Sequence, residues 1–200
     1  MSIIEFNDKY GTEEKCREHL FNTRFAKGFI CPKCGHTHGI RIKSRNLMQC
    51  SECKYQLSAT SGTIMDKTKT EIRKWYYAIY LATVSKRGIS AKELQRQISV
   101  TYKTAWYILK RIRAAMTNAD EKYQLEGIVT IDEAYFSGKD DDEGKPKKRG
   151  RGSSKSKVII AVSLNDKGFP QYAKMEVVPN FKAKTIEKFA QKNIEKGSTI

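Results

Sequence analysis

The sequence predicts a multi-module α+β protein. Three observations predict this class. Two Cys-x-x-Cys pairs lie near the N terminus, three amphipathic helical patterns follow in the middle, and the last third combines strand-like runs with one helical run. A chain of 200 residues can hold one or two domains or several small modules.

Composition favours a globular protein that binds a polyanion. Hydrophobic residues make up 39% of the chain and charged residues 30%, and the net charge is +16. This excess of positive charge favours nucleic acid first and an anionic membrane surface second. The longest apolar stretch, residues 75–84, is far shorter than the roughly 20 residues of a membrane-spanning helix. The N terminus also lacks the pattern of a secretory signal, so we expect a cytoplasmic protein without a membrane partner.

Residues 1–27 form the first predicted module, an N-terminal helix. Within it, Thr12 can cap a helix that runs to residue 27, and Gly28 can end that helix. Cys16 lies on the apolar side. We interpret it as a small core residue, because a thiol outside a repeating cysteine spacing packs more often than it binds.

Two Cys-x-x-Cys pairs, separated by fifteen residues, predict a zinc ribbon over residues 28–57. The four candidate ligands are Cys31, Cys34, Cys50 and Cys53. Each pair places two thiolates on one tight turn, and two turns complete a tetrahedron around Zn²⁺. A redox-active thiol pair is the alternative, although it would need only one such motif. A closed site of four thiolates is structural, because it stabilises a module too small for a core of its own.

The rest of the ribbon is basic and strand-like. Residues 40–43 and 55–59 are predicted as short strands. His36 and His38 could each replace a thiol, but four cysteines already fill the site. The basic residues of this module are Lys33, Arg41, Lys43, Arg45 and Lys54. They suit contact with DNA or with a protein partner, and the sequence does not decide between the two.

Residues 58–69 are predicted as a linker, and residues 68–118 as three helices. Thr70 can cap the first helix, Ser90 and Glu93 form a capping box for the second, and Thr101 can cap the third. The turn between the last two helices is short, which matches a helix-turn-helix. Trp75 and Trp106 are both interpreted as core residues. The apolar face of the third helix is expected to hold Trp106, Leu109, Ile112 and Met116.

Charge separates two interpretations of these helices. Residues 66–116 contain 12 Lys or Arg against 3 Asp or Glu, which favours a DNA-facing surface over a plain three-helix bundle. The N-terminal residues of a recognition helix reach base edges. The candidate DNA-contacting residues are Tyr102, Lys103, Lys110, Arg111 and Arg87.

Residues 127–138 are predicted as a buried strand with Asp132 at its middle. A carboxylate in such a run must be paired, hydrated or bound to a metal. Side chains alternate along a strand, so Asp132 shares a face with Thr130 and Ala134, whereas Glu133 points to the other face. Asp132 is therefore either a metal ligand or a residue at the point where the strand emerges into solvent.

The last module covers residues 124–200 and includes a charged, basic loop over residues 139–157. Strands are predicted at 158–164 and 171–178, a helix at 183–194, and the start of a further strand at 197–200. Three strands, a helix and a returning strand open an RNase H-like domain. The predicted fold class is therefore multi-module α+β: a zinc ribbon, a three-helix helix-turn-helix, and the N-terminal part of an RNase H-like α/β domain.

Two motifs in this order carry a family resemblance. The segment VTYKTAWYILKRIR at residues 100–113 precedes IDEAYFSGK at residues 131–139, and both follow the cysteine pairs. In this combination the chain resembles the insertion-sequence transposases of the ISXO-like type, which carry an N-terminal zinc ribbon, a helix-turn-helix and an RNase H-like DDE domain. The resemblance covers residues 15–200.

The resemblance implies cleavage and joining of double-stranded DNA at transposon ends by an oligomer of the protein. Asp132 matches the first catalytic acid of the family, which implies a Mg²⁺ ligand in a two-metal site. Glu133 is assigned no metal, because it points away. The second acid of the family lies on the strand after the helix, and this sequence stops where that strand begins. We therefore expect a chain truncated at its C terminus, a fragment or a decayed gene product, that is catalytically incomplete. The alternative function is a zinc-containing DNA-binding regulator without catalysis.

Overall fold

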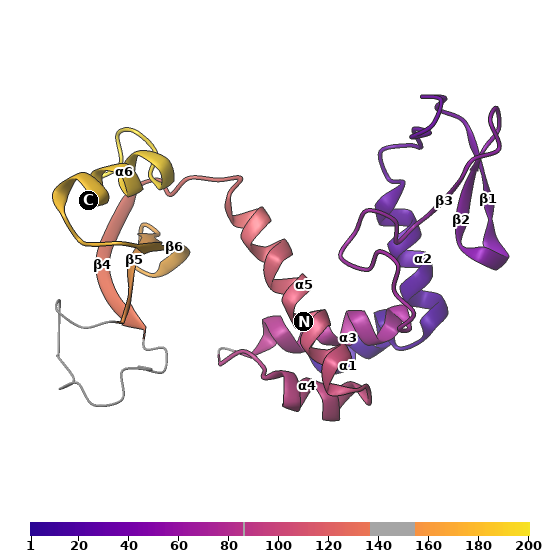
Figure 1. Cartoon of the computed structure of the whole chain (residues 1–200), viewed down its shortest axis with the longest axis horizontal. Coiled ribbons are helices and arrows are strands. Elements are labelled where there is room, and N and C mark those ends of the chain that lie inside the picture. Colours follow the sequence, from indigo (N-terminus) through magenta and orange to yellow (C-terminus); the bar gives the residue numbers. More distant parts are fainter. Residues whose placement is uncertain (86, 137–154) are drawn as a thin grey trace. The chain divides into compact units, whose positions relative to one another are not determined.

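The computed structural model describes residues 1–85, 87–136 and 155–200, which divide into two units, Met1–Met116 and Thr117–Ile200 (Figure 1). Each unit buries its own set of apolar side chains. The first unit contains five helices and a small sheet among its described residues, and the second contains a sheet and one helix among its own.

The N-terminal module contains two helices, α1 (Ile3–Tyr10) and α2 (Glu13–Arg24), where one was predicted. Ser2 and Glu5 form a capping box that begins α1. The Thr12 hydroxyl caps α2 by accepting a hydrogen bond from the Lys15 N–H, as predicted. The sequence prediction missed α1 because its short apolar pattern, IIEF, gives little periodicity. Phe6 buries α1 against Tyr77 and Tyr80 of α3.

Three helices build the main core of the first unit: α3 (Ile72–Val84), α4 (Ala91–Ile98) and α5 (Tyr102–Asp120) (Figure 1). Trp75, Leu94 and Ile108 are almost completely buried at its centre. Ser90 caps α4 by accepting from the Glu93 N–H, and Thr101 accepts from the Thr104 N–H in the first turn of α5. Both caps were predicted. The carboxylate of Glu93 accepts hydrogen bonds from Arg96 and Gln97, so α4 shows the Ser90 half of the predicted capping box.

The cap of α3 differs from the prediction. Thr70 does not cap this helix, whose N-cap residue is Glu71, without a side-chain hydrogen bond. The carboxylate of Glu13, in the first turn of α2, accepts instead from the N–H groups of Ile72 and Arg73 at 3.1 and 2.8 Å. The helix is thus capped by a residue distant in sequence.

Residues 58–69 are packed against the helices and are not a free linker. Ala59 and Met65 are buried, and Met65 belongs to the helical core. The indole N–H of Trp75 donates to the Thr68 hydroxyl at 2.9 Å. The prediction was wrong because small polar residues outnumber the two large apolar side chains, Ile64 and Met65, that anchor the segment.

The predicted ribbon contains a three-stranded antiparallel sheet: β1 (Gly39–Ile42), β2 (Leu47–Cys50) and β3 (Gln56–Ser58). A 3₁₀ turn, η1 (Lys43–Arg45), joins β1 to β2, and Asn46 in the left-handed conformation ends it. Two of these strands were predicted; the central strand β2 was missed, since LMQC has no polar–apolar alternation.

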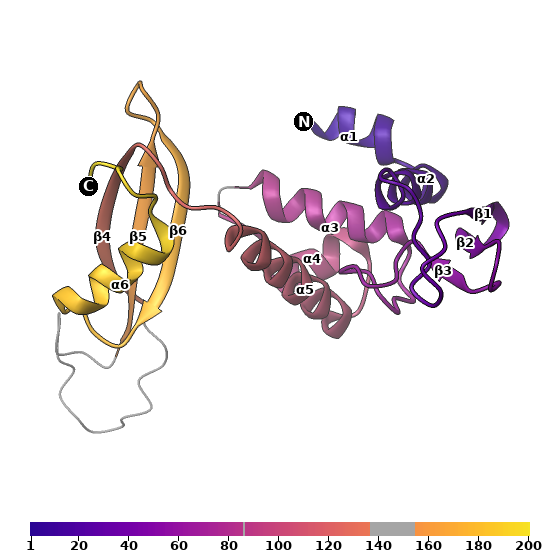
Figure 2. The ribbon, with the colours of Figure 1, turned by 90° about the horizontal axis from the view of Figure 1, so that it is seen from above.

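The second unit is a sheet of three antiparallel strands, β4 (Ile128–Phe136), β5 (Ser156–Leu164) and β6 (Pro170–Val178), in the order β4-β5-β6. The helix α6 (Ala183–Asn193) lies over one face of this sheet (Figure 2). Beneath it, Leu125, Val129, Ile159 and Phe189 form the core. These elements agree with the predicted antiparallel meander and helix.

The chain after α6 returns to β4. Thr199 forms a parallel bridge with Ile128, and hydrogen bonds of 2.8 and 2.9 Å join Thr199 to the backbone of Val129 and Gly127. The strand expected at 197–200 is therefore present as a single bridge. Of the predicted basic loop 139–157, residues 139–154 lie outside the described part of the chain, and Ser156 and Lys157 begin β5.

Candidate zinc site, nucleic-acid surface and carboxylate

Four cysteine sulfur atoms converge between the two Cys-x-x-Cys turns. Sγ of Cys31 lies 3.5 Å from Sγ of Cys53, and Sγ of Cys34 lies 3.6 Å from Sγ of Cys50. All four sulfur atoms lie within 4.8 Å of one another. Tetrahedral Zn²⁺ with bonds of about 2.3 Å holds its sulfur ligands about 3.8 Å apart, so this group fits a closed zinc site.

The local backbone explains why the thiols converge. In each motif the residue after the second cysteine has a positive φ, 73° at Gly35 and 59° at Lys54, which closes a tight turn. The Gly35 N–H donates to the carbonyl of Cys31 at 2.9 Å. Burial opposes ionisation of the Cys31 thiol, but N–H donors from Cys34 and Lys33, with the neighbouring thiols, lower its pKa to about 6. A thiolate is the form that binds metal.

Few apolar contacts support this module without a metal. Its buried residues are Phe29, Cys31 and Cys50, with partly buried Phe25, Met48 and Leu57 around them. The predicted alternatives His36 and His38 are exposed and lie outside the group of converging ligands. The four cysteines thus support a structural Zn²⁺, and they are the ligands that would hold it.

Arg41 joins the ribbon to α2. Its guanidinium donates to both carboxylate oxygens of Glu18, at 2.8 and 2.5 Å, and lies 3.9 Å from the centre of the Phe21 ring. This residue was predicted as part of a basic surface, but the structure uses its charge inside the unit. The other basic residues of the ribbon, Lys33, Lys43, Arg45 and Lys54, are exposed.

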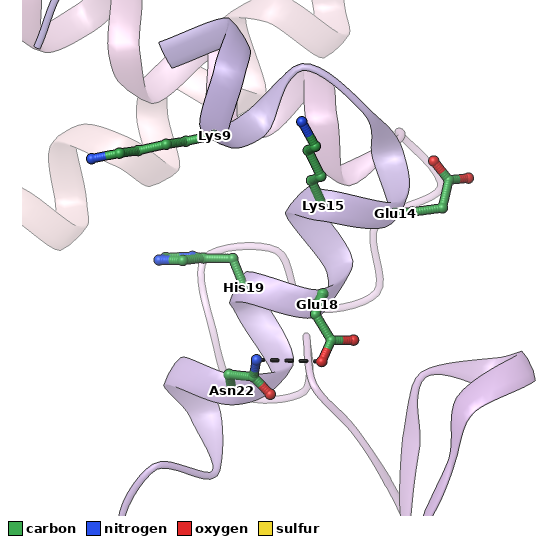
Figure 3. A pocket seen from close by; sticks show the side chains of 6 residues that line it. All are labelled: Lys9, Glu14, Lys15, Glu18, His19 and Asn22. Carbon is green, nitrogen blue, oxygen red and sulfur yellow. Dashed lines mark hydrogen bonds between the residues drawn. The ribbon is translucent and has the colours of Figure 1, made fainter. Parts of the chain in front are cut away.

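A shallow depression on α1 and α2 does not form a convergent site. Figure 3 shows its lining side chains, Lys9, Glu14, Lys15, Glu18, His19 and Asn22, spread outward from the helices. Acidic and basic groups are mixed along it. Glu18 already pairs with Arg41 and accepts a hydrogen bond from Asn22. We assign no ligand to this depression.

One face of α5 presents aromatic and basic side chains to solvent. Tyr102, Lys103 and Lys110, three of the predicted DNA contacts, are exposed there. Lys103 and Lys110 are seven residues apart, so they lie on one side of the helix, two turns from each other. The opposite side buries Ala105, Ile108, Leu109 and Ile112.

Trp106 belongs to the exposed face and not to the core. Its side chain is 51% exposed, which contradicts the prediction, and the ammonium of Lys110 lies 5.3 Å from the centre of its ring. Met116, expected on the same buried stripe, is 52% exposed. Leu109 and Ile112, expected on that stripe too, are buried as predicted. The stripe is completed by Ala105 and Ile108, which were not expected on it. A helical projection centred on these two residues would have placed Trp106 beside Lys103 and Lys110.

The remaining two predicted contacts are placed differently. Arg87 is exposed in the turn between α3 and α4. Arg111 is half-buried, and its guanidinium donates to the Thr63 carbonyl at 3.1 Å and to the Tyr107 hydroxyl. Arg111 therefore holds residues 58–69 against α5.

Asp132 occupies the middle of β4, opposite Ile160 of β5. It is exposed, on the sheet face away from α6, and one carboxylate oxygen accepts from the Glu133 N–H at 2.7 Å. The strand was predicted as buried, but only the face with Val129 and Ile131 packs against the core, because α6 covers one side of the sheet. Asp132 therefore lies where metal or water can reach it.

Within the described ranges, the four cysteines are the one group of three or more side chains that could hold a metal ion. Asp132 does not belong to such a group. A carboxylate alone binds Mg²⁺ weakly, since that ion is usually held by one or two carboxylates together with substrate phosphates.

Comparisons with known proteins match both ends of the chain. A model of the transposase zinc-ribbon domain matches residues 11–56, which include the four cysteines. A model of the ISXO2-like transposase domain matches residues 124–200, which include Asp132. The two matched segments together cover more than half of the chain.

A curated relative agrees with these matches. The chain is 28% identical, over 168 residues, to an uncharacterised protein in the transposable element ISH50 of Halobacterium salinarum. The alignment covers 78% of this chain and 56% of the relative, so the chain spans about half of that protein's length. No solved structure matches the chain. None of the helices in the described ranges is both long and apolar enough to cross a membrane. With its zinc-ribbon and ISXO2-like segments, the chain belongs to the insertion-sequence transposases.

Proposed function

We propose that the chain binds the DNA ends of a transposable element and supplies one acid of a site that cleaves and joins DNA strands. The observation that carries this proposal is one combination: an exposed basic helix face on the first unit and an accessible carboxylate on the second, in a chain of the transposase family. The proposed partner is double-stranded DNA, bound by an oligomer of the protein.

DNA binding is assigned to α4 and α5 as a helix-turn-helix. Three residues separate these helices, and Ser99 has a positive φ of 50°, which allows the tight turn. In this assignment Lys103 and Lys110 would contact phosphates on either side of the groove, and Tyr102 would lie at the N-terminal end of the helix that reaches the bases. Arg87 adds a further phosphate contact, and Arg111 supports the surface by fixing residues 58–69.

Catalysis is assigned to the second unit, as the first part of an RNase H-like domain. Asp132 would hold Mg²⁺ as one acid of such a site. Two such ions would activate the attacking oxygen and stabilise the leaving oxygen during strand transfer. The backbone N–H of Glu133 orients the Asp132 side chain by donating to one carboxylate oxygen. The exposed sheet face leaves the carboxylate accessible to a metal.

A zinc-containing DNA-binding regulator without catalysis is the second candidate. Among the described residues, Asp132 does not belong to a group of three or more side chains that could hold a metal ion, and this favours the regulator. In that case the second unit would serve packing or dimerisation, and divalent metal would bind no particular carboxylate on the sheet.

A Mn²⁺ titration followed by NMR distinguishes the two candidates, because this paramagnetic ion broadens signals near even a weak site. For the transposase we expect selective broadening of amide signals in β4 and the adjoining part of β5, and its loss in Asp132→Asn. Glu133→Gln is the matched control, because Glu133 points to the other face of the same strand. Uniform broadening at all exposed acids, unchanged by Asp132→Asn, would favour the regulator.

A further inference from the structure

Trp106 is exposed without being needed for the core of the first unit. The buried stripe of α5 is complete with Ala105, Ile108, Leu109 and Ile112. An indole that is 51% exposed on a helix face leaves a large apolar surface in water, where a partner can cover it.

The surroundings of Trp106 define the kind of partner. Lys103 lies three residues before it and Lys110 four residues after it, so both lysines share its helix face, and the Lys110 ammonium lies 5.3 Å from the centre of the indole ring. Tyr102 stands one turn earlier and is 52% exposed. A flat aromatic group flanked by positive charges suits a polymer with anionic phosphates outside and apolar or polar base edges between them.

We propose that Trp106 reads base edges in the major groove of duplex DNA, while Lys103 and Lys110 contact the phosphates on either side. This inference rests on the proposed DNA-binding function. Trp106 is the fifth residue of α5, within the N-terminal part that a recognition helix brings to the bases. The indole surface suits the methyl group of thymine, and its single N–H donor suits an acceptor on a base edge.

Fluorescence gives a direct test, because the chain has two tryptophans with opposite exposure. Trp75 is 1% exposed and hydrogen-bonded to Thr68, whereas Trp106 faces solvent. We expect a mixed-sequence duplex to protect Trp106 of the full chain from quenching by acrylamide, a neutral quencher. Trp106→Phe retains Trp75 alone and should show no such change. Unaltered quenching of the wild-type chain in its DNA complex would overturn the inference.

Selection of binding sites from a random duplex library tests the specificity. We expect the wild-type chain to enrich a motif, and Trp106→Ala to lose the preference at one or two adjacent base pairs. Affinity for the selected duplex should fall about tenfold. Lys103→Ala with Lys110→Ala should instead weaken binding to all sequences and leave the motif unchanged. Replacing each selected thymine by deoxyuridine, which lacks the methyl group, identifies the base contacted.

Each outcome bears on a separate claim. The same motif with Trp106→Ala, or preferred binding of single strands, would overturn the role of Trp106 while leaving DNA binding intact. No binding of duplex DNA by the wild-type chain would overturn the proposed function itself. Circular dichroism of each variant checks that its helices are retained. Trp106→Phe keeps an aromatic ring, so we expect it to lose less specificity than Trp106→Ala.

Discussion

Glu13 links two helices through a single carboxylate. Its oxygens accept from two N–H groups at the start of α3 and from the Arg17 guanidinium at 2.7 Å. The first turn of a helix has N–H groups without partners inside the helix, and it favours negative charge. Glu13 therefore caps α3 and fixes α2 against it. Burial alone would raise the pKa of Glu13, but the N–H of Arg73, Arg17 and the N–H of Ile72 lower it below 4.5.

Replacing Glu13 should destabilise the first unit. We expect Glu13→Gln to lower the free energy of unfolding by about 1 kcal/mol at neutral pH, as for the loss of a helix cap. Glu14→Gln, in the same helical turn but exposed, should change it little. Urea denaturation of the three proteins checks this, and an equal loss in both variants would argue against the cap.

The same variant predicts a pH dependence. The folded pKa of Glu13 lies below its ordinary value of 4.5, so the carboxylate stabilises the fold above that pH. This contribution is lost as the pH falls through the folded pKa. The difference in stability between wild type and Glu13→Gln should therefore be full at neutral pH and narrow below about pH 4.5. A difference that stays constant down to pH 3 would contradict the assignment.

Residue by residue, the sequence predicts local caps better than distant ones. Thr12, Ser90 and Thr101 each cap the helix that follows them, and each partner N–H lies only three residues away. The Glu13 cap joins residues 59 and 60 positions apart, which no local pattern shows. Trp106 was misplaced for another reason: apolar residues cover so much of α5 that two buried stripes fit the pattern.

The ribbon is the element whose stability depends most on a bound ion. Three cysteines, Phe29 and a few partly buried side chains are its apolar contacts, and its strands have three or four residues. The ion pair between Arg41 and Glu18 attaches the ribbon to α2. A sheet of this size is marginal in water without further support.

Removing zinc should unfold the ribbon before the helices. We expect one Zn²⁺ per chain, and a strong chelator should remove amide-exchange protection from β1, β2 and β3 while α3, α4 and α5 retain theirs. Cys34→Ser should behave like the chelated protein, whereas His36→Ala should keep its zinc and its protection. Exchange in the three strands that is indifferent to the chelator would refute a structural zinc site.

At the scale of elements, the spacing of apolar residues and the capping and turn residues were enough to predict most helices and the three antiparallel strands of the second unit. The cysteine spacing predicted the converging thiols. The predicted strands at 158–164 and 171–178 are joined by a local turn, in which the Asn165 side chain accepts from the N–H groups of Lys167 and Phe169. Residues 58–69 were predicted wrongly because their packing depends on Met65 and on Arg111, which lies 48 positions away from Thr63. Such contacts are tertiary and leave no periodic signal.

Taken as a whole, the molecule distributes its candidate functional groups over two units. The first contains the cysteine site and the exposed face of α5, and the second contains Asp132 on a sheet face that α6 leaves open. The sequence could predict the residues at each place because cysteine pairs, basic helices and an acid within an apolar strand are local signals. It could not predict which face of β4 is exposed, because α6 alone decides that.

A net charge of +16 should make the proposed DNA binding strongly dependent on salt. Lysines on phosphates release counterions, so each contact adds about 0.9 to the slope of affinity against salt concentration on logarithmic axes. Lysines that merely face solvent add far less. This difference separates a binding face from a solvated one.

The most direct test of the central claim is the affinity of the full chain for duplex DNA over a range of salt concentrations, measured for two pairs of lysines. We predict a steep decrease with salt, and a slope reduced by about two in Lys103→Ala with Lys110→Ala on α5. Lys184→Ala with Lys188→Ala, a matched exposed pair on α6, should leave the slope almost unchanged. Equal reductions by both pairs, or affinity that does not vary with salt, would contradict the claim that α5 is the DNA-binding face.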